Sequence, residues 1–257
     1  MASQPRIVAV FAHPDDESLL AGGTLAACAA RGAEVSLICA TRGGDGPISD
    51  PALATRATLA AVREAELRNA AVELGLRSVA CLDYPDGMLP WVERERITAD
   101  LAARLGRARP DAILTFGAEG LYWHPDHIAI HEITRDAWRQ AAAEGAVARL
   151  YYATWPAGLA QDLAAAMADR CLPADLWGLL HDAFGVPPSM ITTTLDVREY
   201  VPQKLRALRC HRTQLAAHHL FSAIPDDLAV QLLGCEYFVR EAGEAAEPDR
   251  LTAIVCG

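Results

Sequence analysis

Two short clusters of histidine and acidic residues are the parts of this 257-residue chain best suited to chemistry. The first is His13-Pro14-Asp15-Asp16-Glu17 and the second is His124-Pro125-Asp126-His127. Three carboxyl groups and an imidazole within five residues repel one another unless protons or a cation intervene. Imidazole and carboxylate ligands without thiolate suit zinc, although iron(II) or another divalent transition metal is compatible with them. The first cluster therefore indicates a metal site.

Helix capping by aspartate is the alternative interpretation of the first cluster taken alone. The second cluster favours the metal, because capping does not require two His-Pro-Asp triplets. A catalytic zinc site uses three protein ligands and keeps one position open for water. His13, Asp16 and His127 could supply such a set. Asp15 and His124 would then lie close by, as candidates for the acid and the base.

The elements that must position these clusters alternate along the chain. Short apolar runs are typical of strands buried on both faces, and stand at 7–12, 35–40, 79–82 and 112–116. Helical periods fill the intervals, at 18–30, 54–74, 97–108 and from about 126 onwards. This alternation predicts an α/β fold, with a Rossmann-like, mostly parallel sheet and helices on both faces. Both clusters follow strands, so they should meet at the ligand-binding edge of the sheet.

The alternation stops after a strand-like run at residues 150–155. Residues 156–190 contain prolines, aromatics and weak helical periods, after which 191–197 resembles a strand and 202–213 a helix. We expect one domain over 1–257 with a smaller C-terminal addition. Within it, 156–190 and about 215–257 should be variable structure at the edge of the sheet or over the site.

The composition excludes several functional classes. A net charge of -10 disfavours a nucleic-acid partner and docking on anionic lipid. No apolar run approaches the roughly 20 residues that span a bilayer, and the N-terminus lacks signal-peptide features. Seven scattered cysteines without a C-x-x-C pair indicate free thiols rather than disulfides. We therefore expect a cytoplasmic protein; its sequence is compatible with a homo-oligomer but does not fix the oligomeric state.

The chain resembles the PIG-L/LmbE-like deacetylases, whose signatures are A-H-P-D-D-E and H-P-D-H. Both are intact here, at residues 12–17 and 124–127. The resemblance covers most of residues 6–214 in the expected order. Its further matches are Thr41-Arg42-Gly43-Gly44, Arg63-Glu64-Ala65-Glu66, Leu74-Gly75, Asp86-Gly87-Met88, and Lys204 followed by His211-Arg212-Thr213-Gln214.

The resemblance implies a set of residue roles. Zinc would be held by His13, Asp16 and His127. Asp15 would be the general base, and His124 would stabilise the oxyanion and act as general acid, with Asp126 orienting or tuning it. Arg63 and Asp86 would contact substrate; a helix-surface arginine and a common Asp-Gly turn are the ordinary alternatives.

Other polar residues have weaker assignments. His131 stands four residues after His127, a spacing that suits a ligand, but we expect a supporting role because three ligands are already present. Lys204, His211 and Gln214 could order the rim of the site, and Tyr122 could line the pocket.

The predicted activity is metal-dependent hydrolysis of an N-acetyl group from a small N-acylated sugar or conjugate, such as an N-acetylglucosamine derivative. One alternative is a metal-dependent phosphoesterase, which would need more bridging carboxylates. Another is a non-catalytic sugar-binding protein with the same fold, which the intact ligand and base set disfavours. A dinucleotide-binding module is disfavoured because no G-x-G-x-x-G follows the first strand.

Overall fold

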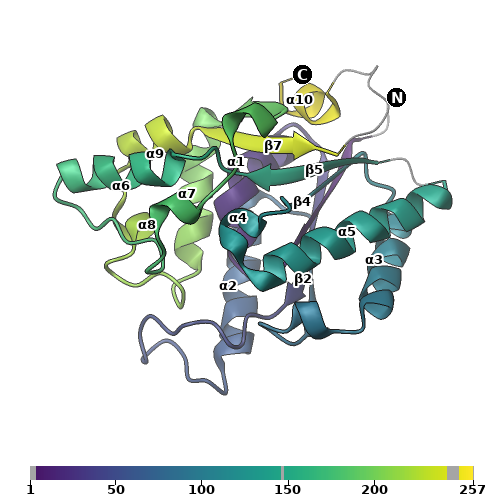
Figure 1. Ribbon diagram of the computed structural model, residues 1–257, viewed down its shortest axis with the longest axis horizontal. Coiled ribbons are helices and arrows are strands. Elements are labelled where there is room, and N and C mark those ends of the chain that lie inside the picture. The colour runs from purple at the N-terminus through teal and green to yellow at the C-terminus, as the bar shows by residue number, and fades with distance from the viewer. Residues whose placement is uncertain (1–3, 146–147, 242–248, 257) are drawn as a thin grey trace.

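The computed structural model describes residues 4–145, 148–241 and 249–256 (Figure 1). Within them, one sheet has the strand order β3-β2-β1-β4-β5-β7-β6. Its strands are β1 (Arg6–Phe11), β2 (Glu34–Thr41), β3 (Ser78–Tyr84), β4 (Ala112–Phe116), β5 (Arg149–Thr154), β6 (Thr193–Asp196) and β7 (Cys235–Arg240). The first five are parallel, β7 is antiparallel to β5, and β6 is antiparallel to β7. The predicted mostly parallel α/β sheet is confirmed.

Helices cover both faces of this sheet. They are α1 (Asp16–Ala30), α2 (Leu59–Leu74), α3 (Arg94–Ala108), α4 (Gly120–Trp123), α5 (Pro125–Ala143), α6 (Leu159–Asp169), α7 (Val201–Cys210), α8 (Leu220–Ala223), α9 (Asp226–Leu233) and α10 (Arg250–Cys256). The helices α1, α2 and α7 pack against one another, and α3 packs against α5. Figure 1 shows these two groups on opposite sides of the strands.

The central strands β1 and β4 create the crevice that holds the site. Residues 7–11 and 112–116 are all buried, as expected for parallel strands covered on both faces. From β1 the chain proceeds to β2 and β3 on one side, and then crosses to β4 on the other side of β1. Strand order therefore reverses between β1 and β4, and the loops after these two strands diverge to leave a ligand-binding crevice.

A buried ion pair and two hydrogen bonds connect the C-terminal addition to the middle of α1. Lys204 Nζ on α7 lies 2.6 Å from Glu236 Oε1 on β7, and both side chains are buried. Glu236 also accepts hydrogen bonds from the backbone N–H groups of Gly23 and Thr24 in α1, at 2.8 and 2.7 Å. A Cβ on Gly23 would lie 2.6 Å from Val197 Cγ2. Glycine at position 23 therefore permits close packing of α1 against Val197. Because it lies inside the helix, it is not part of a phosphate-binding loop.

Two predicted helix ends were wrong, and side-chain hydrogen bonds explain both. α2 begins at Leu59 rather than at 54, because Thr58 Oγ1 accepts from the Thr55 N–H at 2.9 Å and holds a turn. α7 ends at Cys210 rather than at 213, because the Thr213 N–H and hydroxyl donate to Glu66 at 2.9 and 2.6 Å.

The C-terminal addition supplies β6, β7 and the helices from α6 onwards. Residues 242–248 and 257 of the expected addition lie outside the described residues. The six cysteines whose side chains the structure describes are free thiols, as expected. In the described part of the chain, no helix is long and apolar enough to cross a membrane.

Candidate functional site

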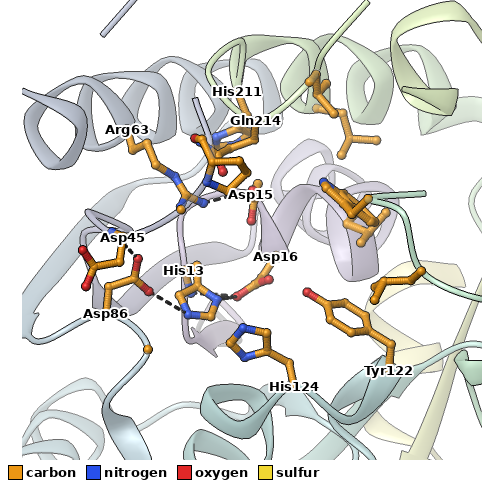
Figure 2. Close-up of a pocket in the computed structure, with 18 residues that line it drawn as sticks. His13, Asp15, Asp16, Asp45, Arg63, Asp86, Tyr122, His124, His211 and Gln214 are labelled. Atoms are coloured by element: carbon orange, nitrogen blue, oxygen red, sulfur yellow. Dashed lines mark hydrogen bonds and ion pairs between the residues drawn. The ribbon is translucent and has the colours of Figure 1, made fainter. Parts of the chain in front are cut away.

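A cavity of about 410 Å³ opens at the carboxyl ends of β1, β2, β3 and β4 (Figure 2). It contains residues of both sequence clusters, so the chain folds them together as expected. Its lining residues are His13, Asp15, Asp16, Leu19, Asp45, Gly46, Pro47, Arg63, Asp86, Gly87, Tyr122, His124, Trp177, Leu179, Leu208, His211, Gln214 and Leu215.

The side chains of His13, Asp16 and His127 converge at this edge of the sheet. His13 Nδ1 lies 3.1 Å from His127 Nε2. The Asp16 oxygens lie 3.5 Å from His13 Nδ1 and 3.3 Å from His127 Nε2. All three residues are buried. Burial would raise the pKa of Asp16, but the charge and hydrogen bond of His127 lower it, so its carboxylate is ionised.

The outer nitrogen of each histidine is already engaged. His127 Nδ1 lies 3.0 Å from the Gly120 carbonyl oxygen, which can only accept, so this nitrogen carries the proton. His13 Nε2 lies 3.1 Å from carboxylate oxygens of both Asp126 and Asp86. In the neutral rings, the lone pairs of His13 Nδ1 and His127 Nε2 therefore face each other. Such an arrangement requires a proton or a cation between them.

Without a metal, a proton between His13 Nδ1 and His127 Nε2 removes the repulsion between their lone pairs. Burial would lower the pKa of His13, but hydrogen bonds to Asp126, Asp16 and Asp86 raise it well above its usual value. A cation held by the same atoms satisfies both lone pairs and the Asp16 carboxylate at once. The donor set thus has the chemistry of a divalent-metal site.

Among the residues that the structure describes, two groups of three side chains have potential ligand atoms that all lie within 4.8 Å of one another, and neither includes Asp16. They are His13 with His124 and His127, and His13 with Asp86 and Asp126. The second group is disfavoured, because Asp126 accepts from the Gly87 and Leu89 N–H groups at 2.8 and 3.0 Å. His131 belongs to neither group. Its Nδ1 lies 2.9 Å from the Phe116 carbonyl, which agrees with the supporting role that we expected.

Asp15 stands at the entrance to α1 with an unusual backbone. Its φ of 123° is rare for a residue other than glycine, and such conformations persist where the surrounding structure fixes them. Arg63 Nη2 donates to Asp15 Oδ2 at 3.0 Å and to the Pro14 carbonyl at 2.6 Å. Burial raises the pKa of Asp15 to about 6 against the opposing charge of Arg63. The Asp15 carboxyl group is therefore held in place by Arg63, and it is more basic than an ordinary aspartate.

A buried pair lies behind Asp15. His211 Nε2 is 3.1 Å from Glu17 Oε1, and Glu17 Oε2 accepts from the Asp15 N–H at 3.0 Å. Burial would lower the pKa of His211, but Glu17 raises it. Glu17 had no assigned role in the sequence, and the structure shows that it connects α7 to the backbone of Asp15.

Of the two roles expected for Asp126, orienting His124 involves its backbone N–H, while the charge of its carboxylate acts on the pKa of His124 and raises it. The Asp126 carboxylate contacts His13 and residues 87–89, and does not orient His124. Only the Asp126 backbone N–H reaches His124, donating to its Nδ1 at 3.2 Å because His124 caps α5. Burial, with the positive charges of His127 and His13, lowers the pKa of His124 to about 4. His124 is thus a neutral ring whose proton lies on Nε2.

The two residues expected to contact substrate, Arg63 and Asp86, both line the cavity. The protein itself engages their side chains to different degrees. Arg63 is 3 % exposed, and its two terminal nitrogens donate to Pro14, Asp15 and Gly43, while its Nε has no hydrogen-bond partner. This arrangement favours a role in positioning Asp15. Asp86 accepts from the Asp45 N–H at 2.7 Å and faces the cavity, where Figure 2 shows both aspartates on the same side of His13. Substrate contact by either residue stays a prediction.

The sequence did not single out Trp177 and Leu179, which line the cavity from within 156–190. Trp177 lies 6.4 Å, centroid to centroid, from Tyr122, whose ring points towards the cavity centre in Figure 2. The aromatic residues Trp177 and Phe184 within 156–190 were the available signal in the sequence, and they could not place the Trp177 ring in space.

The chain is similar to several known proteins. Residues 8–138 match the PIG-L family, described as GlcNAc-PI de-N-acetylase. A 1D-myo-inositol 2-acetamido-2-deoxy-alpha-D-glucopyranoside deacetylase from Thermobispora bispora is 31% identical over 267 residues, covering 93% of this chain and 88% of the relative.

Two solved structures share the fold at lower identity. One is N,N'-diacetylchitobiose deacetylase from Pyrococcus horikoshii, with a TM-score of 0.63 and 20% identity, covering 91% of this chain and 83% of that one. The other is the 4-carboxy-2-hydroxymuconate hydratase from Pseudomonas putida KT2440, with a TM-score of 0.68 and 19% identity, covering 96% and 100%. With both signatures intact and the fold in place, this chain belongs to the PIG-L family.

Proposed function

We propose that this protein is a zinc-dependent N-deacetylase that hydrolyses the N-acetyl group of an N-acetylglucosamine derivative. The observation that carries the proposal is the convergence of two imidazole lone pairs and the Asp16 carboxylate beside a separate, fixed Asp15 carboxyl group. The relatives named as deacetylases of a sugar–inositol conjugate support the same substrate class.

His13, Asp16 and His127 would hold the metal. Each offers one ligand atom, and both histidines have their other nitrogen fixed by hydrogen bonds, as metal-binding histidines usually do. None is a thiolate, which fits zinc in a three-ligand catalytic site. A divalent cation here supplies Lewis acidity, which polarises an acyl carbonyl and acidifies a water molecule.

Side chains of the protein then transfer the protons of the reaction and stabilise the developing negative charge. Asp15 accepts a proton from the attacking water as its oxygen bonds to the acyl carbon. His124 donates a hydrogen bond from Nε2 to the carbonyl oxygen as negative charge develops there. The C–N bond breaks as Asp15 returns its proton to the leaving amine, giving the amine and the carboxylic acid. A neutral His124 favours this hydrogen-bonding role over that of general acid.

The charge of the cavity disfavours the phosphoesterase alternative. Four carboxyl groups line it, from Asp15, Asp16, Asp45 and Asp86. The single arginine in the lining, Arg63, is engaged by the protein itself. A phosphate dianion would therefore be repelled at several positions.

The direct test is acetate release from N-acetylglucosamine and from its inositol conjugate, with zinc restored. Asp15→Asn should lower kcat by at least about 100-fold because the base is removed. Asp50→Asn, at an exposed turn, is the matched control and should retain full activity. Full activity of Asp15→Asn, or release of phosphate from sugar phosphates in place of acetate, would contradict the proposal.

A further inference from the structure

The cavity has two unlike walls on opposite sides of His13. On the Nε2 side of the ring, Asp86 lies 3.1 Å away and Asp45 donates its N–H to Asp86. On the Nδ1 side lies His127, and the Tyr122 ring is 5.3 Å from His127 and 6.4 Å from Trp177. Figure 2 shows Asp45 and Asp86 on one side of His13 and Tyr122 on the other. One wall is acidic and the other aromatic.

Trp177 is held firmly in the aromatic wall. Its φ of 55° is unusual for a bulky residue, and Gly178 follows with a φ of 70°. The Gly178 N–H donates to Asp175 Oδ1 at 3.0 Å, and the Trp177 ring lies 4.4 Å from the His219 ring. His219 is itself fixed, because its Nδ1 accepts from the Phe221 N–H at 3.2 Å. The ring is thus preorganised at the cavity surface.

Further apolar side chains enlarge the non-polar lining. They come from α1, from the loop after β2, from 156–190 and from α7 and its C-terminal end: Leu19, Pro47, Leu179, Leu208 and Leu215. A cavity of about 410 Å³ lies in the range that encloses most of a small organic ligand. The methyl of an acetyl group would cover little of this apolar lining.

The two halves of an N-acyl sugar need different surroundings. Sugar hydroxyl groups lose hydrogen bonds to water on binding and require polar partners, which Asp45 and Asp86 provide. An acyl chain has no hydrogen-bonding groups beyond its amide and gains from apolar contact. The acidic lining also disfavours a substrate that carries negative charge. These requirements orient the amide, with its sugar towards Asp86 and its acyl carbon chain towards Trp177.

We propose that the wall formed by Tyr122, Trp177 and Leu179 is an acyl-chain subsite that accepts uncharged N-acyl groups longer than acetyl, with Trp177 as its specificity-determining residue. The inference rests on the proposed amide hydrolysis and names the substrate class of the same site. Each methylene buried against the wall should raise kcat/KM roughly threefold to fourfold.

Two isomers test the orientation. N-hexanoylglucosamine and the butyl glycoside of N-acetylglucosamine have the same composition, with four carbons moved from one end to the other. The wild-type enzyme should hydrolyse the hexanoyl isomer with a kcat/KM at least about tenfold higher. Trp177→Ala should remove most of this preference, and Trp177→Phe should keep part of it. Trp91→Ala, at an exposed tryptophan outside the cavity, is the matched control.

Binding to the Asp15→Asn variant separates this inference from the proposed function. Calorimetric titration with both isomers should show tighter binding of the hexanoyl isomer, and this difference should shrink when Trp177→Ala is added. That binding pattern without any turnover by the wild type would retain the subsite and reject the deacetylase. Equal binding of the isomers, preference for the butyl glycoside, or a hexanoyl preference that Trp177→Ala leaves unchanged would overturn the subsite.

Discussion

At the scale of single residues, hydrogen bonds on the outer nitrogens of the two imidazole rings fix where their lone pairs point. The Gly120 carbonyl fixes the proton on His127 Nδ1, and Asp86 and Asp126 engage His13 Nε2. In the neutral rings, these contacts leave one lone pair on each ring directed at the other ring. The proposed metal ligands are therefore preorganised by the protein itself.

Arg63 is expected to act through Asp15 more than through substrate. Its guanidinium spans Asp15 and the Pro14 and Gly43 carbonyls, a geometry that the single ammonium group of lysine cannot reproduce. Arg63→Lys should lower kcat by roughly tenfold with little change in KM, because a misplaced base slows the chemical step. Steady-state kinetics on the N-acetyl substrate checks this, with the exposed Arg68→Lys on the same helix as control. An increase confined to KM would instead favour substrate contact.

The sequence predicted that the histidine and aspartate side chains of the two clusters would lie together, because both clusters follow strands of the same sheet. It could not place Trp177, whose position depends on contacts with Tyr122 and His219 from distant parts of the chain. The further contacts of the Asp126 carboxylate were not predicted for a similar reason, because its partners at 87–89 follow a different strand.

At the scale of elements, α1 is the part that the rest of the molecule holds in place. Its N-terminus carries Asp15 and Asp16, and its middle is fixed by Glu236 through two backbone N–H groups. Lys204 neutralises Glu236 from α7. The C-terminal addition thereby stabilises the helix that positions Asp15, the proposed base, and Asp16, a proposed metal ligand.

Removing one partner of the buried Lys204–Glu236 pair should destabilise the folded protein. Lys204→Met leaves an unpaired buried carboxylate and should lower the free energy of unfolding by about 3 to 5 kcal/mol. Urea unfolding at neutral pH measures the loss. Adding Glu236→Gln removes the unpaired charge and keeps an acceptor for α1, so the double variant should recover part of the stability. A loss below about 1 kcal/mol in the single variant would show that the pair contributes little.

The parallel core of the fold was predictable because strand and helix alternate at regular intervals. β7, at Cys235–Arg240, was not predicted as a strand. Its sequence CEYFVR has only a short alternating pattern, and its place between β5 and β6 follows from pairing with residues far away in the chain. Local periodicity contains no information about such pairing.

At the scale of the whole molecule, stability should depend on pH through His219. Burial lowers its pKa to about 4, against roughly 6.5 in an unfolded chain. As the pH falls below 6.5, the unfolded state binds the proton first, so stability is lost between about pH 6.5 and 4 and then levels off. The loss should be about 2 to 3 kcal/mol.

His219→Asn isolates this effect. Asparagine can still accept the Phe221 N–H at the start of α8 but cannot titrate. Chemical unfolding of both proteins from pH 7.5 to 4 should show a smaller loss for the variant, and the difference should develop within that window. Parallel curves for the two proteins would show that His219 titrates alike in the folded and unfolded states.

The shared fold does not by itself fix the reaction, since a hydratase and a deacetylase are both among the structural neighbours. We propose that the metal ligands and the base are separate residues. Bound zinc and acetate release, measured together in wild type, His127→Ala and Asp15→Asn, test this separation. We expect about one zinc per chain in the wild type and in Asp15→Asn, with activity lost in the latter, and loss of both zinc and activity in His127→Ala. Zinc retained by His127→Ala, or lost from Asp15→Asn, would show that the roles are not divided in this way.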